Sequence, residues 1–558
     1  MLEILSERRA LVVSLWVFVA AFVLLLLFMD LRLGAYDEGI ILAGGQLVAS
    51  GAVPHRDFYA VYGPGQFYIL AGLFHLFGTS FVVARVYDVV VRAAIVASVF
   101  WILARRSPPL ISTGTAVICG LWMFGCEYYL YPIFPVLLVS LLGTGVLLPV
   151  DGRPAGPRRL IIAGALTGLS ALFRYDAGFF VLAAHLTAIA LLAPVQGLSR
   201  RRAALNLLRQ VAFYGAGTAA TFLPPAVVLL WLGAGPGFIH DVILQSAYYV
   251  PMRHLPFPGA GALRASPSEV AVYLPFVAAV LATITMIRTT MAAKPEPFVP
   301  ESGRRFVLVF GLLIIALLIK GLVRPTAIHM MLAIIPSTIL IGLLVQRTWR
   351  LSPRWRVALR LAIFMAIAPP LHQALERGIS IFQEPTNTFL ADATEPDRLN
   401  RSASGAGLPN VAGAQMGIAD MCAAELVSTL SNPGERILVA TGRHDKIFIN
   451  NVALYFATSR LPGTHWHHYD PGLQTRADIQ TRIIADMQSA KVRWVMRDAS
   501  ADDVREPNAS AISSGVKTLD LYLLRQYRPV AEFGTISVWL RKTEVVSIPP
   551  APTICRQG

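Results

Sequence analysis

The feature that most constrains this chain is a series of long apolar segments with few charged side chains. The first of them, residues 11–29, contains no charged residue and is long enough to cross a bilayer as a helix. Its apolar core is longer than that of a cleaved signal peptide and no small-residue cleavage site is evident, so we expect it to stay as a membrane span. Further segments bring the expected total to about eleven spans: 81–104, 110–125, 131–150, 160–173, 177–194, 210–232, 268–287, 306–322, 326–346 and 357–374.

The composition points to the same class of protein. Hydrophobic residues make up 55% of the chain, charged residues only 15%, and the mean hydropathy is +0.58, which predicts a polytopic α-helical membrane protein. The net charge of +15 lies in short basic clusters between the apolar segments rather than along one patch. We therefore read the basic residues as signals of membrane topology and expect no nucleic acid as a partner.

The basic clusters alternate with the expected spans. Arg8 and Arg9 precede the first span, and later clusters fall in every second loop: 105–106, 153–159, 200–209, 288–305 and 347–356. Because cytoplasmic loops of membrane proteins are enriched in Lys and Arg, this pattern predicts a cytoplasmic N-terminus and an extracytoplasmic C-terminus. Residues 62–78 are also apolar, but a span there would invert every later loop. We expect this segment to lie in the outer interface instead.

The first outer loop, residues 30–80, is thus predicted to be a structured cap. It contains two adjacent acids, Asp37 and Glu38, shortly after the first span. Neighbouring side chains on a helix do not share a face, so one carboxylate could serve as a general base while the other braces it. The alternative is that both acids stabilise the N-terminus of a helix that starts near Gly39.

Several basic side chains are expected near the outer surface. The segment 160–173 would extend about 21 Å as a helix, which is short for a bilayer, so Arg174 and Asp176 should lie below the outer surface and line a cavity. A plain Arg174–Asp176 ion pair is the alternative. Arg324 and His329 mark a similar outward turn, although a single His at such a place is more commonly structural.

The last part of the chain differs in character. No span-length apolar run follows residue 376, and we divide the chain into a membrane domain at 1–375, a linker and irregular segment at 376–430, and an extracytoplasmic α/β domain at 431–558. Strands are expected at 436–440, 492–496 and 536–540, and an amphipathic helix at 478–490. Residues 385–415 have the composition of a surface linker.

Cysteine and histidine spacing adds little chemistry. A disulfide between Cys422 and Cys555 is compatible with an outer domain, and no cysteine pair has metal-ligand spacing. The run from His465 to His468 lacks the carboxylate or thiolate partners of a metal site. No metal ligands are assigned from the sequence.

The order of these features resembles the C-type integral-membrane glycosyltransferases (GT-C), which include protein mannosyltransferases and the aminoarabinose transferase of lipid A. The resemblance rests on a first span that ends in Asp-Glu, the cap patterns Gly51-x-Val-Pro-x-Arg-Asp57 and Tyr62-Gly-Pro-Gly65, Arg174 in a short broken helix, the turn from Arg324 to His329, and an outer α/β domain. It covers essentially the whole chain.

The resemblance implies transfer of a sugar from a polyprenyl-phosphate carrier at the outer face of the plasma (inner) membrane. The acceptor would be a hydroxyl of a cell-envelope glycan, a glycolipid such as lipopolysaccharide, or a protein. Asp37 would be the base, with Asp57 in reserve, and the reaction would invert the sugar. The leaving phosphate would be bound by Arg174, Arg324, His329 or Arg56, with Tyr62 beside them. Some relatives also bind a divalent metal.

Two other classes of function stay open at this stage. A transporter or lipid flippase could use the same intramembrane charges as a translocation path, but no pair of broken helices suggests the inverted repeats common in such proteins. A receptor or assembly scaffold would leave Asp37 and Glu38 without a role.

Overall fold

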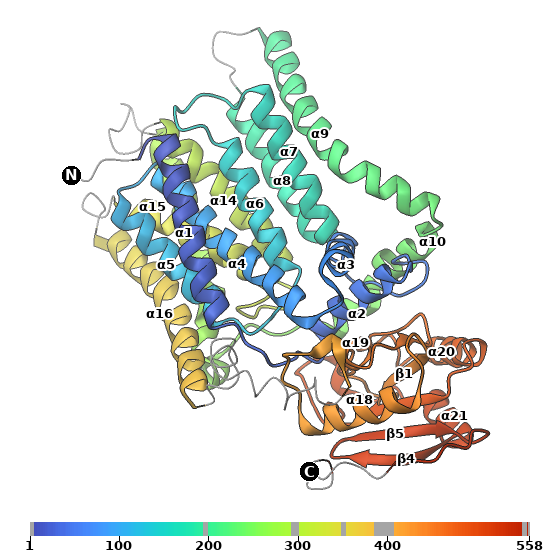
Figure 1. Cartoon of the computed structure of the whole chain (residues 1–558). Coiled ribbons are helices and arrows are strands. Elements are labelled where there is room, and N and C mark those ends of the chain that lie inside the picture. Colours follow the sequence, from blue (N-terminus) through green and yellow to red (C-terminus); the bar gives the residue numbers. More distant parts are fainter. Residues whose placement is uncertain are drawn as a thin grey trace.

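The computed structural model describes residues 5–193, 199–291, 301–346, 353–383, 407–549 and 555. It has two parts, a large helical bundle and a smaller domain with a β-sheet at one end of it (Figure 1). The fold class expected from the sequence is therefore confirmed: a polytopic α-helical membrane protein with a C-terminal α/β domain.

Eleven long helices form the bundle within the described residues. By length and composition alone, seven of them could cross a membrane, and α5, α6 and α15 are shorter apolar helices. Their bounds are α1 Glu7–Leu27, α4 Phe81–Ala104, α5 Pro109–Gly125, α6 Ile133–Leu147, α7 Pro157–Phe173, α8 Tyr175–Leu192, α9 Arg200–Trp231, α13 Leu274–Met291, α14 Glu301–Gly321, α15 Met331–Val345 and α16 Pro353–Gln383.

These helices match the expected spans but extend further at their ends. α9 starts at Arg200 rather than at residue 210, because its first turns carry the basic cluster outside the apolar segment. α16 continues to Gln383, into the segment expected to be irregular. The start of α1 and the C-terminal domain lie at opposite ends of the bundle (Figure 1).

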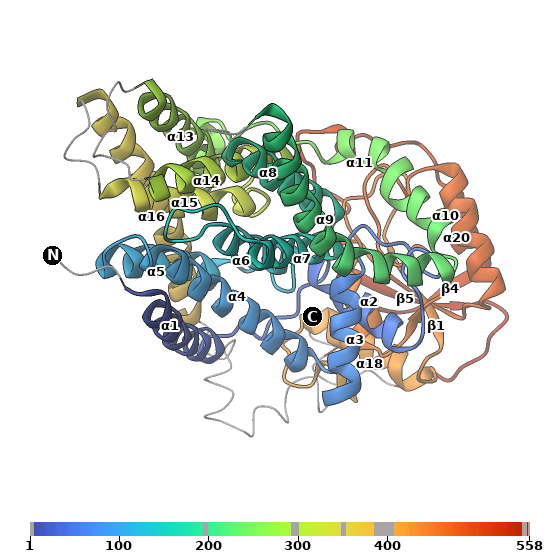
Figure 2. The ribbon, with the colours of Figure 1, turned by 90° about the horizontal axis from the view of Figure 1, so that it is seen from above.

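The cap consists mainly of two helices, α2 Asp37–Ala49 and α3 Gly65–Phe77, between the bundle and the C-terminal domain (Figure 1). The apolar segment at 62–78 thus forms the helix α3. A second connection, between α9 and α13, folds into short helices. They are α10 Gly235–Phe238, η1 Ile239–Leu244, α11 Ser246–Arg253, α12 Ala260–Ala265 and η2 Pro267–Tyr273. Of these, α10 and α11 lie beside the C-terminal domain when viewed from above (Figure 2), whereas η2 packs against α16.

The C-terminal domain is built on a five-stranded mixed sheet in the order β2-β1-β3-β5-β4. β1 is parallel to β2 and β3, while β5 is antiparallel to β3 and β4. The strands are β1 Arg436–Thr441, β2 Leu461–Pro462, β3 Trp494–Asp498, β4 Tyr527–Phe533 and β5 Ile536–Arg541. The helices are η7 Pro409–Val411, α18 Ile418–Leu430, α19 Ala453–Ala457, α20 Ala477–Ser489, η8 Ala509–Ala511 and α21 Thr518–Gln526.

The sequence predicted β1, α20, β3 and β5 of this domain but not β2, β4, α18 or α21. Most of the expected linker at 385–415 lies outside the described residues. α18 lies within the segment at 376–430 that was expected to be irregular. The expected disulfide is present, since Cys422 in α18 is bonded to Cys555.

The C-terminal domain packs directly on the cap. The Ala453 N–H of α19 donates a hydrogen bond of 3.0 Å to the carbonyl of Ala35, and the Tyr59 N–H donates one of 2.8 Å to the carbonyl of His465. A side chain at Gly39 would place its Cβ 2.5 Å from the Ala453 nitrogen, so the glycine permits this close approach. The two parts therefore hold one another in a defined arrangement at the start of α2.

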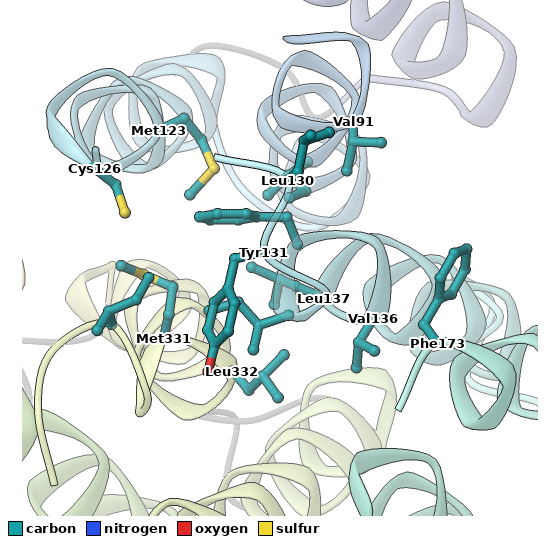
Figure 3. Packing of buried hydrophobic residues seen from close by; sticks show 14 of the residues in the cluster. Val91, Met123, Cys126, Leu130, Tyr131, Val136, Leu137, Phe173, Met331 and Leu332 are labelled. Carbon is teal, nitrogen blue, oxygen red and sulfur yellow. The ribbon is translucent and has the colours of Figure 1, made fainter. Parts of the chain in front are cut away.

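The helical bundle has a hydrophobic core. Buried hydrophobic side chains from α4, α5, α6, α7 and α15 pack against one another there, among them Met123, Leu137 and Met331 (Figure 3). Tyr131 joins this packing from the connection between α5 and α6. A close-packed core fixes the backbone on which the polar side chains of the junction stand.

Candidate active site

The two acids at the start of α2 have different surroundings. Glu38 is 3% exposed, and its carboxylate accepts hydrogen bonds of 2.8 Å from Arg85 Nη2 and from the Gly34 N–H. Arg85 also donates to the carbonyls of Asp30 and Arg32, so this ion pair fixes the chain between α1 and α2. Glu38 has the bracing contacts that the sequence suggested for one of the two acids.

Asp37 is left with a different contact. Its Oδ1 accepts a hydrogen bond of 2.8 Å from the hydroxyl of Tyr62, and the residue is partly exposed. Burial raises the pKa of the Asp37 carboxyl, while the Tyr62 hydroxyl and the positive charge of Arg253 lower it again. A carboxylate with a raised pKa and one ordered partner has the properties required of a general base.

The glycines of the cap bring Tyr62 to its place. The Gly63 N–H donates to the carbonyl of Phe173 at 3.0 Å, and a Cβ at Gly63 would lie 2.2 Å from the Leu172 carbonyl oxygen. This stretch of the cap therefore lies against the end of α7, one residue before Arg174. The Tyr-Gly-Pro-Gly pattern thus sets a specific contact between the cap and the bundle.

Arg174 lies over the face of the Tyr62 ring. Its guanidinium carbon is 5.6 Å from the centre of that ring, and its Nη1 donates to the Tyr131 hydroxyl at 3.4 Å. Arg174 also pairs with Asp176 at 3.0 Å, which is the alternative considered from the sequence. The pairing does not remove Arg174 from the cavity described next, because both residues line it.

These side chains border a cavity of about 360 Å³, which we call the first cavity. Its charged lining is mainly basic, with four basic side chains and two acidic ones: Arg174, Arg253, Lys320, Arg324, Asp176 and Asp241. Tyr62, Tyr131 and His329 line it as well. Five of the residues named from the sequence therefore meet in one place: Tyr62, Arg174, Asp176, Arg324 and His329. Asp37 joins them through Tyr62.

Two of the basic side chains are held by the C-terminal domain. Arg253 Nη2 donates to Asp470 Oδ1 at 3.0 Å, and Arg324 Nη1 donates to Glu506 Oε2 at 2.9 Å. Asp470 Oδ1 lies 3.0 Å from the hydroxyl of Tyr36, the residue before Asp37. The domain thus orients side chains on both sides of the first cavity without lining it itself.

His329 is suited to hydrogen bonding rather than to carrying charge. Burial lowers its pKa well below the usual range, and the positive charge of Arg324 lowers it further. Its Nδ1 lies 2.7 Å from the Thr326 hydroxyl. A neutral imidazole at this place can donate to or accept from a ligand, but the cations of the first cavity are the arginines and Lys320.

Arg56 and Asp57 lie elsewhere. They pair with each other at 2.7 Å with side chains that are 41% and 37% exposed, and neither lines the first cavity. Arg56 also donates to the Leu232 carbonyl at 3.1 Å, and Asp57 accepts from the Val53 N–H at 2.7 Å. Their contacts hold the turn of the cap in shape.

The sequence reasoning missed two basic residues of the first cavity. Lys320 lies near the end of α14, 3.9 Å from Asp176, and a Lys within an apolar helix was an available signal for a functional site. Arg253 lies in the outer connection, and its partner Asp470 is more than two hundred residues away in sequence. Nothing local in the sequence predicts that pair.

Metal ligation has no support from the donor set. Within the described part of the chain, no group of three or more His, Cys, Asp or Glu side chains could hold a metal ion. His467 and His468 are fully buried in the C-terminal domain, and the His468 ring stacks on Tyr59 at 4.6 Å. The described residues thus offer no donor set for a divalent metal.

Comparison with known proteins gives structural likeness rather than sequence matches. No protein-family model matches the sequence, and no curated protein matches it significantly. The archaeal oligosaccharyltransferase AglB from Archaeoglobus fulgidus, solved with an inhibitory peptide and a dolichol-phosphate, is 12% identical with a TM-score of 0.47 over 89% of this chain and 70% of that one. Its apo form gives 11% identity and a TM-score of 0.49 over 88% and 69%.

ArnT from Cupriavidus metallidurans bound to undecaprenyl phosphate is 17% identical, with a TM-score of 0.48 over 95% of this chain and 97% of that one. Both proteins have the C-type glycosyltransferase fold that the sequence resemblance names. At these identities the likeness assigns no role to any side chain. This chain is thus similar, over most of its length, to membrane enzymes that have the C-type glycosyltransferase fold.

Proposed function

We propose that this chain is a membrane glycosyltransferase that moves a sugar from a polyprenyl-phosphate donor to an acceptor hydroxyl. The observation that carries the proposal is that Tyr62 contacts two side chains of opposite charge, Asp37 and Arg174. Asp37 accepts a hydrogen bond from its hydroxyl, and Arg174 lies against its ring at the wall of a cavity rich in basic side chains. A base and a set of cations are the two things that this reaction needs.

The reaction follows from that placement. Asp37 takes the proton of the acceptor hydroxyl as its oxygen attacks the anomeric carbon of the donor sugar. The bond from that carbon to the phosphate oxygen breaks, and the polyprenyl phosphate leaves with the electron pair. Arg174, Lys320 and Arg324 stabilise the charge that grows on the phosphate. Because attack and departure occur on opposite sides of the carbon, the sugar is inverted.

The lining of the first cavity favours a lipid-linked donor over a nucleotide sugar. Phe180 comes from α8 and Ile319 from α14, both candidate membrane helices, and Ile319 is 51% exposed. A polyprenyl chain can lie along such apolar side chains while its phosphate reaches the basic ones. A soluble nucleotide sugar has no hydrocarbon chain to pack against these apolar side chains.

We further infer that the reaction takes place at the outer face of the plasma membrane, with a cytoplasmic N-terminus and an extracytoplasmic C-terminal domain. The basic clusters alternate with the apolar segments along the chain, which supports this orientation under the positive-inside rule. The Cys422–Cys555 disulfide supports this orientation, since disulfides persist in oxidising compartments. The acceptor would be a glycan, glycolipid or protein of the cell envelope.

The test is transfer by purified protein from a radiolabelled polyprenyl-phosphate sugar to envelope extract. Asp37→Asn keeps the size of the side chain but removes its basicity, so we expect transfer to fall by about 100-fold or more. Asp478→Asn, at the exposed start of α20, is the matched control and should transfer normally. Full transfer by Asp37→Asn, or a strict need for a nucleotide sugar, would overturn the proposal.

A further inference from the structure

A second cavity lies beside the first and has no role in the reaction described so far. It has a volume of about 340 Å³ and is bordered by the connection between α5 and α6, by η2, by the turn between α14 and α15, and by α16. Its lining includes the polar side chains of Glu127, Tyr128, Glu269, Gln373, Glu376 and Arg377.

The two cavities share a wall. Arg324 and His329 line both of them. A row of aromatic rings also leads from one to the other, since Tyr131 lies 6.0 Å from Tyr62 in the first cavity and 6.0 Å from Tyr128 in the second. Burial raises the pKa of Tyr128 to about 12, and the negative charge of Asp37 adds to that rise. The row of rings therefore connects the second cavity with Tyr62, whose hydroxyl donates to the proposed base Asp37.

Two buried polar groups in this cavity lack partners within the described structure. Gln373 Oε1 and Arg377 Nη2 are both buried and make no hydrogen bond, and Arg377 as a whole is 3% exposed. Its Nη1 lies 3.3 Å from Asp30, so one side of the guanidinium is paired and the other is not. Leaving a buried donor or acceptor without a hydrogen bond destabilises the folded protein. Such groups are suited to a polar ligand.

The charges of the second cavity indicate what kind of ligand this is. Three acidic side chains and two basic ones line it, and both basic ones are already paired: Arg324 with Glu506, and Arg377 with Asp30. A phosphate would find carboxylates and few free cations. Carboxylate, amide and guanidinium groups beside an exposed Tyr ring instead match an uncharged sugar, whose hydroxyls both donate and accept and whose apolar face packs on aromatic rings.

We propose that the second cavity is the acceptor subsite and that it binds an uncharged sugar residue of a glycan. This rests on the proposed glycosyl transfer for its role but not for its binding chemistry. The acceptor sugar lies between Gln373, Arg377 and Tyr128, and its reactive hydroxyl extends past Tyr131 toward Asp37. The donor phosphate occupies the first cavity, on the other side of Arg324 and His329.

Binding can be tested without any transfer. The probes are neutral disaccharides (maltose, cellobiose and chitobiose) added to the full-length protein in nanodiscs, with saturation-transfer NMR as the readout. We expect signal from at least one disaccharide, reduced about tenfold in Gln373→Leu, which keeps the volume but removes the amide. Gln383→Leu, on the exposed end of the same helix, is the matched control and should bind like the wild type.

A kinetic test separates the two cavities. Transfer to envelope acceptor and hydrolysis of the donor by water are measured in the same preparation, and we expect Gln373→Leu and Tyr128→Ala to lower the ratio of transfer to hydrolysis about tenfold. Equal losses of both activities would assign the second cavity to the donor and overturn the inference. So would disaccharide binding that is unchanged in both variants, or preferential binding of a Ser- and Thr-containing peptide.

Failure of the proposed function has a different signature. If wild-type protein neither hydrolyses nor transfers from any polyprenyl-phosphate sugar, the reaction proposed for the first cavity is wrong. Gln373-dependent disaccharide binding in that case would still identify the second cavity as a sugar site. Absence of such binding would overturn the sugar site itself.

Discussion

The two cavities are similar in size and share a wall, yet their linings differ in chemistry. The first is lined by four basic and two acidic side chains, and the second by three acidic and two basic ones. The side chains common to both are Arg324 and His329. One shared wall, which contains Arg324 and His329, can therefore separate an environment suited to a phosphate from one suited to sugar hydroxyls.

The cavities also differ in what orients their polar groups. Arg253 and Arg324 of the first cavity are held by Asp470 and Glu506 of the C-terminal domain. The second cavity is completed by α16, whose Gln373 and Arg377 retain unpaired atoms. Buried polar atoms without a hydrogen bond border the first cavity as well, on Gln245 (Oε1) and Arg253 (Nε) among the described residues. The difference between the cavities is therefore the C-terminal domain, which pairs with Arg253 and Arg324 of the first.

The change with the largest expected effect is Arg174→Gln, which removes a cation from the first cavity. We expect kcat to fall by about 100- to 1,000-fold, because the lost interaction stabilises charge that develops on the leaving phosphate. Arg174→Lys should recover part of the rate, since Lys keeps the charge but lacks the forked geometry. The measurement is transfer kinetics with protein that inserts and purifies normally.

Arg158→Gln is the matched control, because Arg158 is exposed in the first turn of the same helix, at its other end. It should transfer at the wild-type rate. If Arg174→Gln does so as well, then Arg174 serves only its ion pair with Asp176, and the basic character of the first cavity has no catalytic meaning.

Arg324→Gln should have the next largest effect and should involve both cavities. Because Arg324 lines both, we expect kcat to fall about 10- to 100-fold and the KM for the acceptor to rise in the same variant. Glu506→Gln should reproduce part of the loss, since Glu506 holds the guanidinium from the C-terminal domain. An effect on kcat without any change in acceptor KM would contradict the shared wall.

These residues show where the sequence was informative and where it was not. Apolar length and basic clusters predicted the bundle, because a bilayer imposes both on a chain. The short apolar segment 160–173 predicted that Arg174 and Asp176 line a cavity, and they do. The ion pairs Glu38–Arg85, Arg253–Asp470 and Arg324–Glu506 could not be predicted, since each joins distant segments that only the packed fold brings together.

The missed groups of the second cavity have a related cause. Gln373 and Arg377 lie on a helix that the sequence analysis ended at residue 374, because its apolar character fades there. The helix continues to Gln383, so Gln373 lies at the end of the predicted span and Arg377 lies in the extension beyond it, and both line the cavity. Hydropathy marks where a helix leaves the hydrocarbon, and it does not mark where the helix ends.

A smaller effect is expected from Tyr62→Phe, and it concerns pH. Asp37 acts as a base only when ionised, so transfer is lost as pH falls through its pKa, which burial raises above the usual range. The Tyr62 hydroxyl lowers that pKa, so Tyr62→Phe should shift the acidic limb of the kcat/KM profile to higher pH and reduce the rate at acidic pH about fivefold.

Tyr68→Phe, on an exposed face of α3, is the matched control for this variant and should leave the pH profile unchanged. A limb that stays in place in Tyr62→Phe, or that shifts to lower pH, would mean that Asp37 is not the group whose ionisation limits the rate. The first cavity would then retain its cations but lose its base.

The smallest effect is expected from Asp57→Asn, which tests the boundary of the first cavity. Asp57 is the other acid of the cap that sequence reasoning held in reserve as the base, yet it pairs with Arg56 at the surface and lines neither cavity. An exposed ion pair contributes about 0–1 kcal/mol to stability, so the variant should fold and should transfer within about twofold of the wild type. Transfer kinetics beside Asp37→Asn provide the measurement. If Asp57→Asn loses activity while Asp37→Asn retains it, the base lies on the turn of the cap, and the reacting groups must meet outside the wall shared by the two cavities.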